Sequence, residues 1–100
     1  MYGLHKRDLE FVWDPAKESA NRRKHGISFV EAATAFLDES ASLFHDPDEA
    51  GDEDRYILIG LSDKTRLLVI CHCYRGQEST IRIISARRAD RRETIEYART

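Results

Sequence analysis

The sequence predicts an α+β fold: an antiparallel β-sheet meander with two N-terminal helices and a C-terminal helix, in the order β-α-α-β-β-β-β-α. Residues 14–37 carry helix-start signals and an apolar repeat of helical period. Residues 42–87 carry segments rich in Ile, Leu, Val and Tyr, and the short turns between the longest of them indicate antiparallel neighbours. We expect residues 1–100 to form a single domain, with residues 1–9 as a flexible N-terminal extension.

The first predicted strand and helix have clear boundaries. Residues 10–13 read as a short strand, and Asp14-Pro15 then begins a helix, with Asp as the N-cap and Pro at the first helical position. Gly26 ends this helix after residue 25, because glycine adopts the left-handed conformation of a helix C-terminus at low cost. The first helix is therefore predicted over residues 15–25.

A second helix follows at once. Ser28 is a predicted N-cap, and Glu31, three residues on, completes the pattern of a capping box. The apolar residues that follow recur at i, i+3, i+4, i+7 and i+8, so the helix is expected to lay one stripe on the core. The stripe consists of Phe29, Ala32, Ala33, Phe36 and Leu37.

The second half of the chain is dominated by strand-like segments. Their β-branched and aromatic content favours strands, and Ser62-Asp63-Lys64 and Arg75-Gly76-Gln77 are typical of turns. Strands are predicted at residues 42–45, 55–61, 66–74 and 79–87, an acidic loop at 46–54, and a last helix at about 88–99.

Charge is distributed unevenly along the chain. The net charge of −2 conceals nine acidic and no basic residues in residues 31–54, and ten basic against five acidic residues in residues 55–100. The individual acidic residues are explained as solvated surface groups, whereas the cationic remainder is compatible with a polyanionic ligand. A near-neutral total charge therefore does not exclude nucleic acid.

Arginines are concentrated in the last strand and helix. Strand alternation places Arg82 and Arg88 on one face and Arg87 on the other. Arg82 and Arg87 lie among apolar residues, so they need either buried carboxylate partners or a ligand. Arg88, Arg91 and Arg92 form a cationic strip near a helix N-terminus, where the helix dipole is already positive and an anion would be stabilising. Ordinary salt bridges are the alternative for Arg91 and Arg92.

The last turn of the first helix is also cationic. Lys24 and His25 come directly before Gly26, at a chain reversal where both side chains can project from the fold. Histidine exchanges a proton near neutral pH, which suits general acid or base catalysis. The alternative is electrostatic, because cations stabilise a helix C-terminus through its exposed carbonyls.

Several function classes have no motif behind them. Cys71 and Cys73 share one face of a strand and are expected to be reduced core residues, because a zinc site needs two further ligands. We therefore expect no metal and no cofactor, and the sequence holds no P-loop, GxSxG, HExxH or GxGxxG motif. It holds no signal peptide or membrane span either, which predicts a cytoplasmic protein.

A set of short motifs lies in a fixed order across residues 10–98. They are Phe11-x-Trp13-Asp14, Asn21-x-x-Lys24-His25-Gly26-x-x-Phe29-x-Glu31-Ala32, Asp46, Arg55, Gly60 and Ile84-Ser85-Ala86-Arg87. None of these motifs is specific alone, but in their order and spacing they resemble the BrnT family of bacterial toxins.

The resemblance implies a RelE-like ribonuclease fold and a metal-independent endoribonuclease that inhibits translation. In such a reaction the ribose 2′-OH attacks the adjacent phosphorus, so the site needs proton transfer and cations around the phosphorane. His25 is the candidate acid or base, and Glu31 is a weaker alternative base. The candidate catalytic residues are Lys24, His25, Arg82 and Arg87, and the candidate RNA-binding residues are Arg55, Arg88 and Arg91.

The leading hypothesis is an endoribonuclease toxin that acts on messenger RNA. By resemblance its partner is a BrnA-like ribbon-helix-helix antitoxin, with operator DNA contacted only through that antitoxin and no role for a membrane. Two hypotheses compete with it: a nucleic-acid-binding regulatory module without catalysis, and a protein-interaction domain whose acidic segment meets a basic partner.

Overall fold

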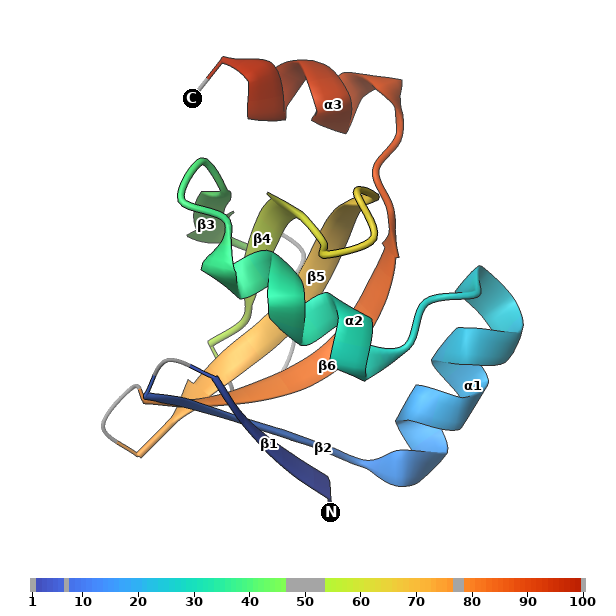
Figure 1. Cartoon of the computed structure of the whole chain (residues 1–100), viewed down its shortest axis with the longest axis vertical. Helices are drawn as coiled ribbons and strands as arrows, with labels where there is room; N and C mark the ends of the chain where they lie inside the picture. Colours follow the sequence, from blue (N-terminus) through green and yellow to red (C-terminus); the bar gives the residue numbers. More distant parts are fainter. Residues whose placement is uncertain (1, 7, 47–53, 77–78, 100) are drawn as a thin grey trace.

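The computed structural model describes residues 2–6, 8–46, 54–76 and 79–99. Along the described chain the elements are β1 (Tyr2–Lys6), β2 (Leu9–Trp13), α1 (Pro15–His25), α2 (Phe29–Thr34), the 3₁₀ turn η1 (Ala35–Leu37), β3 (Ser42–His45), β4 (Tyr56–Leu61), β5 (Leu67–Arg75), β6 (Thr80–Arg88) and α3 (Arg91–Ala98) (Figure 1). Most predicted boundaries agree with these within one residue. The predicted acidic loop falls mainly on residues 47–53, outside the described residues.

The α+β class is confirmed, but the sheet is mixed rather than purely antiparallel. The described strands form one six-stranded sheet in the order β1-β2-β6-β5-β4-β3. Strands β3 to β6 are the predicted antiparallel meander, whereas β2 pairs parallel with β6 over Glu10–Val12 and Thr80–Arg82. Parallel pairing requires a long crossover, which residues 14–79 supply here.

The predicted flexible extension at residues 1–9 is also corrected. Residues Tyr2–Lys6 form β1, which pairs antiparallel with β2 and places Leu4 opposite Phe11. Asp8, at the turn between these strands, has a φ of 68°, a left-handed conformation that Asp tolerates better than most residues. The element order therefore begins β-β rather than β, and β1 supplies partners for the outer edge of β2.

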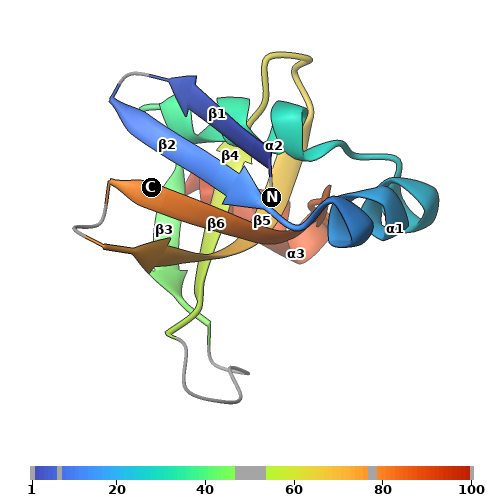
Figure 2. The same ribbon diagram turned by 90° about the horizontal axis from the view of Figure 1, so that it is seen from below.

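Helix α2 covers one face of the sheet and completes the core (Figures 1 and 2). Five of its six residues are buried, and the predicted stripe is confirmed at Phe29, Ala32 and Ala33, each 0% exposed. Phe29 meets Trp13 edge to face, with ring centroids 6.0 Å apart. The chain then tightens into η1, from which Phe36 packs edge to face on Phe11 of β2.

Two further features complete the fold. Helix α3 begins at Arg91 rather than near residue 88, because β6 continues to Arg88 and Asp90 is the N-cap. No helix in the described residues is long and apolar enough to cross a membrane.

Candidate active site

Helix α1 carries the predicted proton-transfer residue and is polar on all sides. Its boundaries are those predicted: Asp14 accepts a hydrogen bond from the Ala16 N–H at 2.9 Å, and Gly26 is left-handed with a φ of 72°. Lys24 and His25 are both exposed in the last turn. Among the residues of α1, all of which the structure describes, Asn21 alone is buried.

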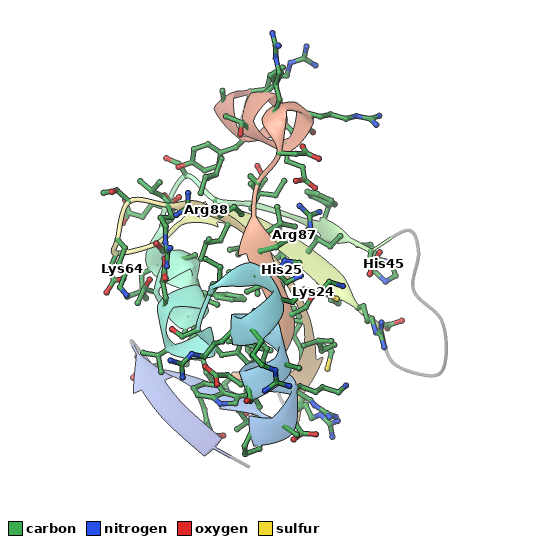
Figure 3. The ribbon with its side chains drawn as sticks, turned by 90° about the vertical axis from the view of Figure 1, so that its right-hand side faces the viewer. Lys24, His25, His45, Lys64, Arg87 and Arg88 are labelled. Atoms are coloured by element: carbon green, nitrogen blue, oxygen red, sulfur yellow. The ribbon has the colours of Figure 1, made fainter. Side chains whose placement is uncertain are left out.

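Asn21 joins the last turn of α1 to the end of β6. Its Nδ2 donates to the Ala86 carbonyl at 2.8 Å, and its Oδ1 accepts from the Ala86 N–H at 3.1 Å. His25 lies one helical turn beyond Asn21, and Arg87 follows Ala86 directly. The last turn of α1, which carries Lys24 and His25, is therefore held beside the end of β6, which carries Arg87. Figure 3 labels the three side chains in a view from the side of α1.

Arg87 forms a bidentate ion pair with Glu93 of α3. Its Nη1 and Nη2 donate to the two Glu93 carboxylate oxygens at 2.8 and 2.7 Å. The ion pair lowers the pKa of Glu93, with the hydrogen bond from Arg87 as the largest cause, and raises the pKa of Arg87. Glu93 also accepts from the Asp90 N–H at 2.9 Å, so one carboxylate closes the capping box of α3 and orients Arg87.

A β-bulge changes which arginines share a face of β6. The register with β5 shifts between Cys71 and His72, so that Cys71 pairs with Ser85 and His72 with Ile83. Ile84 is the extra residue, and it interrupts the predicted alternation. As a result Arg82, opposite Cys73, lies on the same face as Arg87 rather than on the opposite face, and Arg88 does not share this face.

The structure does not bring Arg82 to the Lys24 and His25 end of the strand. Arg87 lies five positions after Arg82, which corresponds to roughly 15 Å along a strand. Arg82 is half-buried and pairs across the β5–β6 ladder with Cys73. Arg55 comes directly before Tyr56, the partner of His72, so continuing that register places Arg55 on the other side of Cys73, and its charge acts on the neighbouring Cys71. Two groups of predicted cations result: Lys24, His25 and Arg87 where α1 meets the end of β6, and Arg82 with Arg55 further back along the sheet face that carries Arg87.

Cys71, on this same face, is a half-buried free thiol beside a carboxylate. Burial, followed by the charge of Asp46, raises its pKa, and its Sγ lies 3.8 Å from an Asp46 carboxylate oxygen. A thiol with a raised pKa holds little of the thiolate that acts as nucleophile or metal ligand. Within the described residues no group of three or more His, Cys, Asp or Glu side chains gathers as a metal cluster.

The remaining predicted arginines lie around α3. Arg88 is exposed at the end of β6, and Arg91 is exposed in the first turn of α3. The carboxylates of Asp90 and Glu93 supply part of the negative charge that offsets the α3 dipole and these arginines. None of the α3 residues is buried, and Tyr97 also ties the helix down by donating to Asp38 at 2.8 Å.

Glu31 has a structural role that the predicted capping box does not describe. The Ser28 hydroxyl accepts from the Glu31 N–H at 3.1 Å as expected, but the Glu31 carboxylate is 3% exposed and pairs with Arg66. It also accepts from the Ser62 hydroxyl at 2.7 Å. The hydrogen bond from Arg66 is the main cause that lowers the pKa of Glu31, so this carboxylate is a poor general base and belongs to the α2 side of the fold.

Comparison with known proteins agrees with this arrangement. The model of the family described as "Ribonuclease toxin, BrnT, of type II toxin-antitoxin system" matches residues 13–93. The chain belongs to the BrnT family. A 1.1 Å crystal structure of the Brucella abortus ribonuclease toxin BrnT superposes with a TM-score of 0.61 and 25% sequence identity, over 81% of this chain and 96% of that one. No curated protein matches.

BrnT membership gives the site a context at family level: a ribonuclease toxin whose substrate is RNA and whose partner is an antitoxin protein. The matched residues include both groups of cations and α1. Sequence reasoning assigned no role to Asn21 or Glu93, although each had a signal. Helix α1 has no apolar stripe to dock it, and Asp90-x-x-Glu93 has the form of a capping box.

Proposed function

We propose that this chain is a RelE-like endoribonuclease that cleaves messenger RNA without a metal ion and thereby inhibits translation. The observation that supports the proposal is the docking of the last turn of α1, which bears a histidine and a lysine, at the strand end that bears an oriented arginine. Asn21 holds the last turn of α1, with Lys24 and His25, against the strand residue that precedes Arg87. These side chains supply the proton transfer and the charge stabilisation that phosphodiester cleavage by an internal hydroxyl requires.

In the proposed reaction the ribose 2′-oxygen bonds to the adjacent phosphorus as its proton leaves. The bond from phosphorus to the 5′-oxygen breaks, the 5′-oxygen takes a proton, and a 2′,3′-cyclic phosphate remains. His25 exchanges one of these protons as general base or acid. Lys24 and Arg87 stabilise the extra negative charge of the phosphorane, which is present only in the transition state.

The ion pair with Glu93 is compatible with this role of Arg87. A guanidinium has five N–H donors, and the contacts to the Glu93 oxygens use one Nη1 and one Nη2 hydrogen. Nη1 also donates to the Arg88 carbonyl at 3.3 Å, and the Nε–H and the outer Nη2 hydrogen point to other sides of the planar group. Glu93 therefore orients Arg87 without using all the donors that a phosphate needs.

The second group of cations serves the flanking RNA. Arg82 lies too far along β6 to share the reacting phosphate with Arg87, so we assign Arg82 and Arg55 to neighbouring phosphates on the same sheet face. Arg88 and Arg91 extend the positive surface on the other side of the site. Such contacts neutralise phosphates without reading sequence, and they make binding dependent on salt.

The proposal extends to the partner and the compartment. Because the family is that of type II toxin–antitoxin systems, we propose a BrnA-like ribbon-helix-helix antitoxin that neutralises this toxin in the cytoplasm. Operator DNA is then reached only through the antitoxin. A short basic reading frame next to the gene, with a ribbon-helix-helix pattern, is the simplest support for this part.

The test is incubation of the purified protein with RNA in the presence of EDTA. His45→Ala is the matched control, because His45 is also an exposed histidine but lies on β3, which β4 and β5 separate from β6. Wild type and His45→Ala are therefore expected to cleave equally. His25→Ala and Arg87→Ala are expected to lose cleavage while remaining folded. Cleavage that disappears with EDTA overturns the metal-free reaction, and equal cleavage by His25→Ala overturns the site. Salt-dependent RNA binding with no product from wild type supports the regulatory module instead.

A further inference from the structure

Helix α1 is attached to the sheet in an unusual way. A surface helix normally docks through an apolar stripe, but in α1 even Ala16 and Ala20 are exposed. Asn21 is 7% exposed, and its side chain makes three hydrogen bonds: the two to Ala86 and one from Nδ2 to the Ile27 carbonyl at 3.0 Å. A buried amide therefore takes the place of an apolar stripe.

The edge of β6 explains why an amide occupies this position. Strand β2 pairs with β6 only as far as Arg82, so the edge beyond it needs another partner. At Ala86 the Asn21 side chain supplies one donor and one acceptor, the pair that a backbone peptide of a further strand would offer. Without Asn21, the N–H and C=O of a residue that is 0% exposed lose their partners.

We propose that Asn21 is a positioning residue for RNA cleavage, which holds Lys24 and His25 at a fixed distance from Arg87. It acts through the backbone on both sides: Ala86 precedes Arg87, and Ile27 follows the left-handed turn at Gly26. This inference rests on the proposed function. It assigns Asn21 no contact with RNA, because its donors and its acceptor are engaged within the protein.

The first variant is Asn21→Ala, which removes all three hydrogen bonds. We expect kcat for RNA cleavage to fall by about 100-fold, the scale on which misplacement of a catalytic group by about 1 Å acts. The KM is expected to change by less than about threefold, because the arginines that hold the flanking phosphates are untouched. An unchanged kcat in folded Asn21→Ala overturns the proposal.

The matched control is Thr34→Val in α2. Thr34 is 9% exposed, accepts from the Asp63 N–H at 2.9 Å and donates to the Glu31 carbonyl at 2.6 Å, so it is also a buried polar clamp. We expect this variant to lose a similar amount of stability while its kcat stays within about twofold of wild type. If both variants lose kcat in proportion to stability, Asn21 is only structural.

Asn21→Asp keeps the proposal testable if Asn21→Ala does not fold. Its ionised carboxylate still accepts from the Ala86 N–H but faces the carbonyl oxygens of Ala86 and Ile27 without a hydrogen to donate. On protonation it regains a donor for the Ala86 carbonyl. The ratio of its cleavage rate to that of wild type is therefore expected to rise as pH falls, and a flat ratio contradicts the proposal.

Hydrogen exchange of the Ala86 amide separates this proposal from the proposed function. Its acceptor is Asn21 Oδ1, so protection is expected to fall in Asn21→Ala and to remain in Thr34→Val. If Asn21→Ala loses this protection but wild type does not cleave RNA, the clamp stands and the proposed ribonuclease activity is overturned. Unchanged protection in Asn21→Ala, when wild type does cleave RNA, overturns the clamp alone.

Discussion

Helices α1 and α2 are neighbours in the chain, yet they are held on the sheet in opposite ways. Helix α2 buries five of its six residues, and Phe29, Ala32 and Ala33 are fully enclosed. Helix α1 buries only Asn21 among its described residues. Helix α2 is a part of the core, whereas α1 lies on the surface and its exposed last turn carries Lys24 and His25.

The two helices are attached to the sheet by different kinds of interaction, one apolar and one hydrogen-bonded. Apolar burial stabilises a helix without regard to small rotations, because the hydrophobic effect is not directional. Hydrogen bonds to a side-chain amide are directional and hold one orientation. A helix that presents catalytic groups gains from the second kind of attachment, and substitutions in the two helices are therefore expected to have different consequences.

The largest expected effect on stability comes from the core helix. Phe29→Ala removes a fully buried ring that packs against Trp13, and we expect it to lower the free energy of unfolding by about 3 to 5 kcal/mol. Denaturant unfolding measures this loss. Lys17→Ala on the exposed side of α1 is the contrasting variant and is expected to change stability by less than about 0.5 kcal/mol. Equal losses would remove the contrast between the helices.

The core is also expected to respond to pH through His72. Its ring is 0% exposed, and its Nε2 has no hydrogen-bond partner in the described part of the chain. Burial lowers the pKa of His72 to about 4 from an ordinary value of 6.5. As pH falls, the unfolded chain therefore binds this proton before the folded chain does. The contribution of neutral His72 to stability is fully present above about pH 6.5, and the free energy of unfolding then falls toward pH 4 by about 3 kcal/mol in total.

His72→Phe removes this titration and keeps an aromatic ring between Phe36 and Tyr74. The difference in unfolding free energy between the variant and wild type is expected to shift in favour of the variant as pH falls from 6.5 to 4. Urea unfolding at a series of pH values measures it. A difference that does not vary with pH contradicts the assignment to His72.

A smaller change is expected where Glu31 meets Arg66. Glu31→Gln keeps a hydrogen-bond acceptor but leaves the Arg66 charge, whose side chain is 25% exposed, with a neutral partner. We expect a loss of about 2 kcal/mol, since partial exposure reduces the cost of breaking the pair. Because the pKa of Glu31 is lowered, this contribution is present above its ordinary value of 4.5 and disappears as pH falls through the lowered value.

Of the two ion pairs, the one beside the site is expected to contribute less to stability, and Glu93→Gln tests it. Its partner Arg87 has a side chain that is 43% exposed, so the pair contributes less than about 1 kcal/mol. The cleavage rate is expected to fall several-fold, because Arg87 loses the partner that orients it. Single-turnover kinetics measures this. A variant that unfolds more easily by several kcal/mol but cleaves normally would place Glu93 with the core, not with the site.

The same comparison separates what the sequence could predict from what it could not. The ends of α1 are local chemistry: Asp14 and Pro15 begin the helix and Gly26 ends it, so its boundaries were predictable. The stripe of α2 is likewise a local repeat. The second half of the Ser28 capping box was not predictable, because the Glu31 carboxylate pairs with Arg66, 35 residues away.

Sheet geometry shows the same division. Alternation predicts strands, but it does not encode the direction of a neighbour, and so the parallel pairing of β2 with β6 was missed. The bulge at Ile84 has no Gly or Pro to signal it, and it changed the face assigned to Arg87 relative to Arg82. The proximity of His25 to Arg87 depends on Asn21 reaching across 65 residues, which spacing alone does not reveal.

A double-mutant cycle between α1 and β6 tests whether His25 and Arg87 act on one phosphate. His25→Ala, Arg87→Ala and the double variant are compared by single-turnover RNA cleavage, with folding verified for each. If the two residues act on one phosphate, the losses are far from additive, and the double variant is hardly slower than the slower single variant. Fully additive losses would show that α1 and Arg87 act at separate places and would contradict a site assembled at their junction.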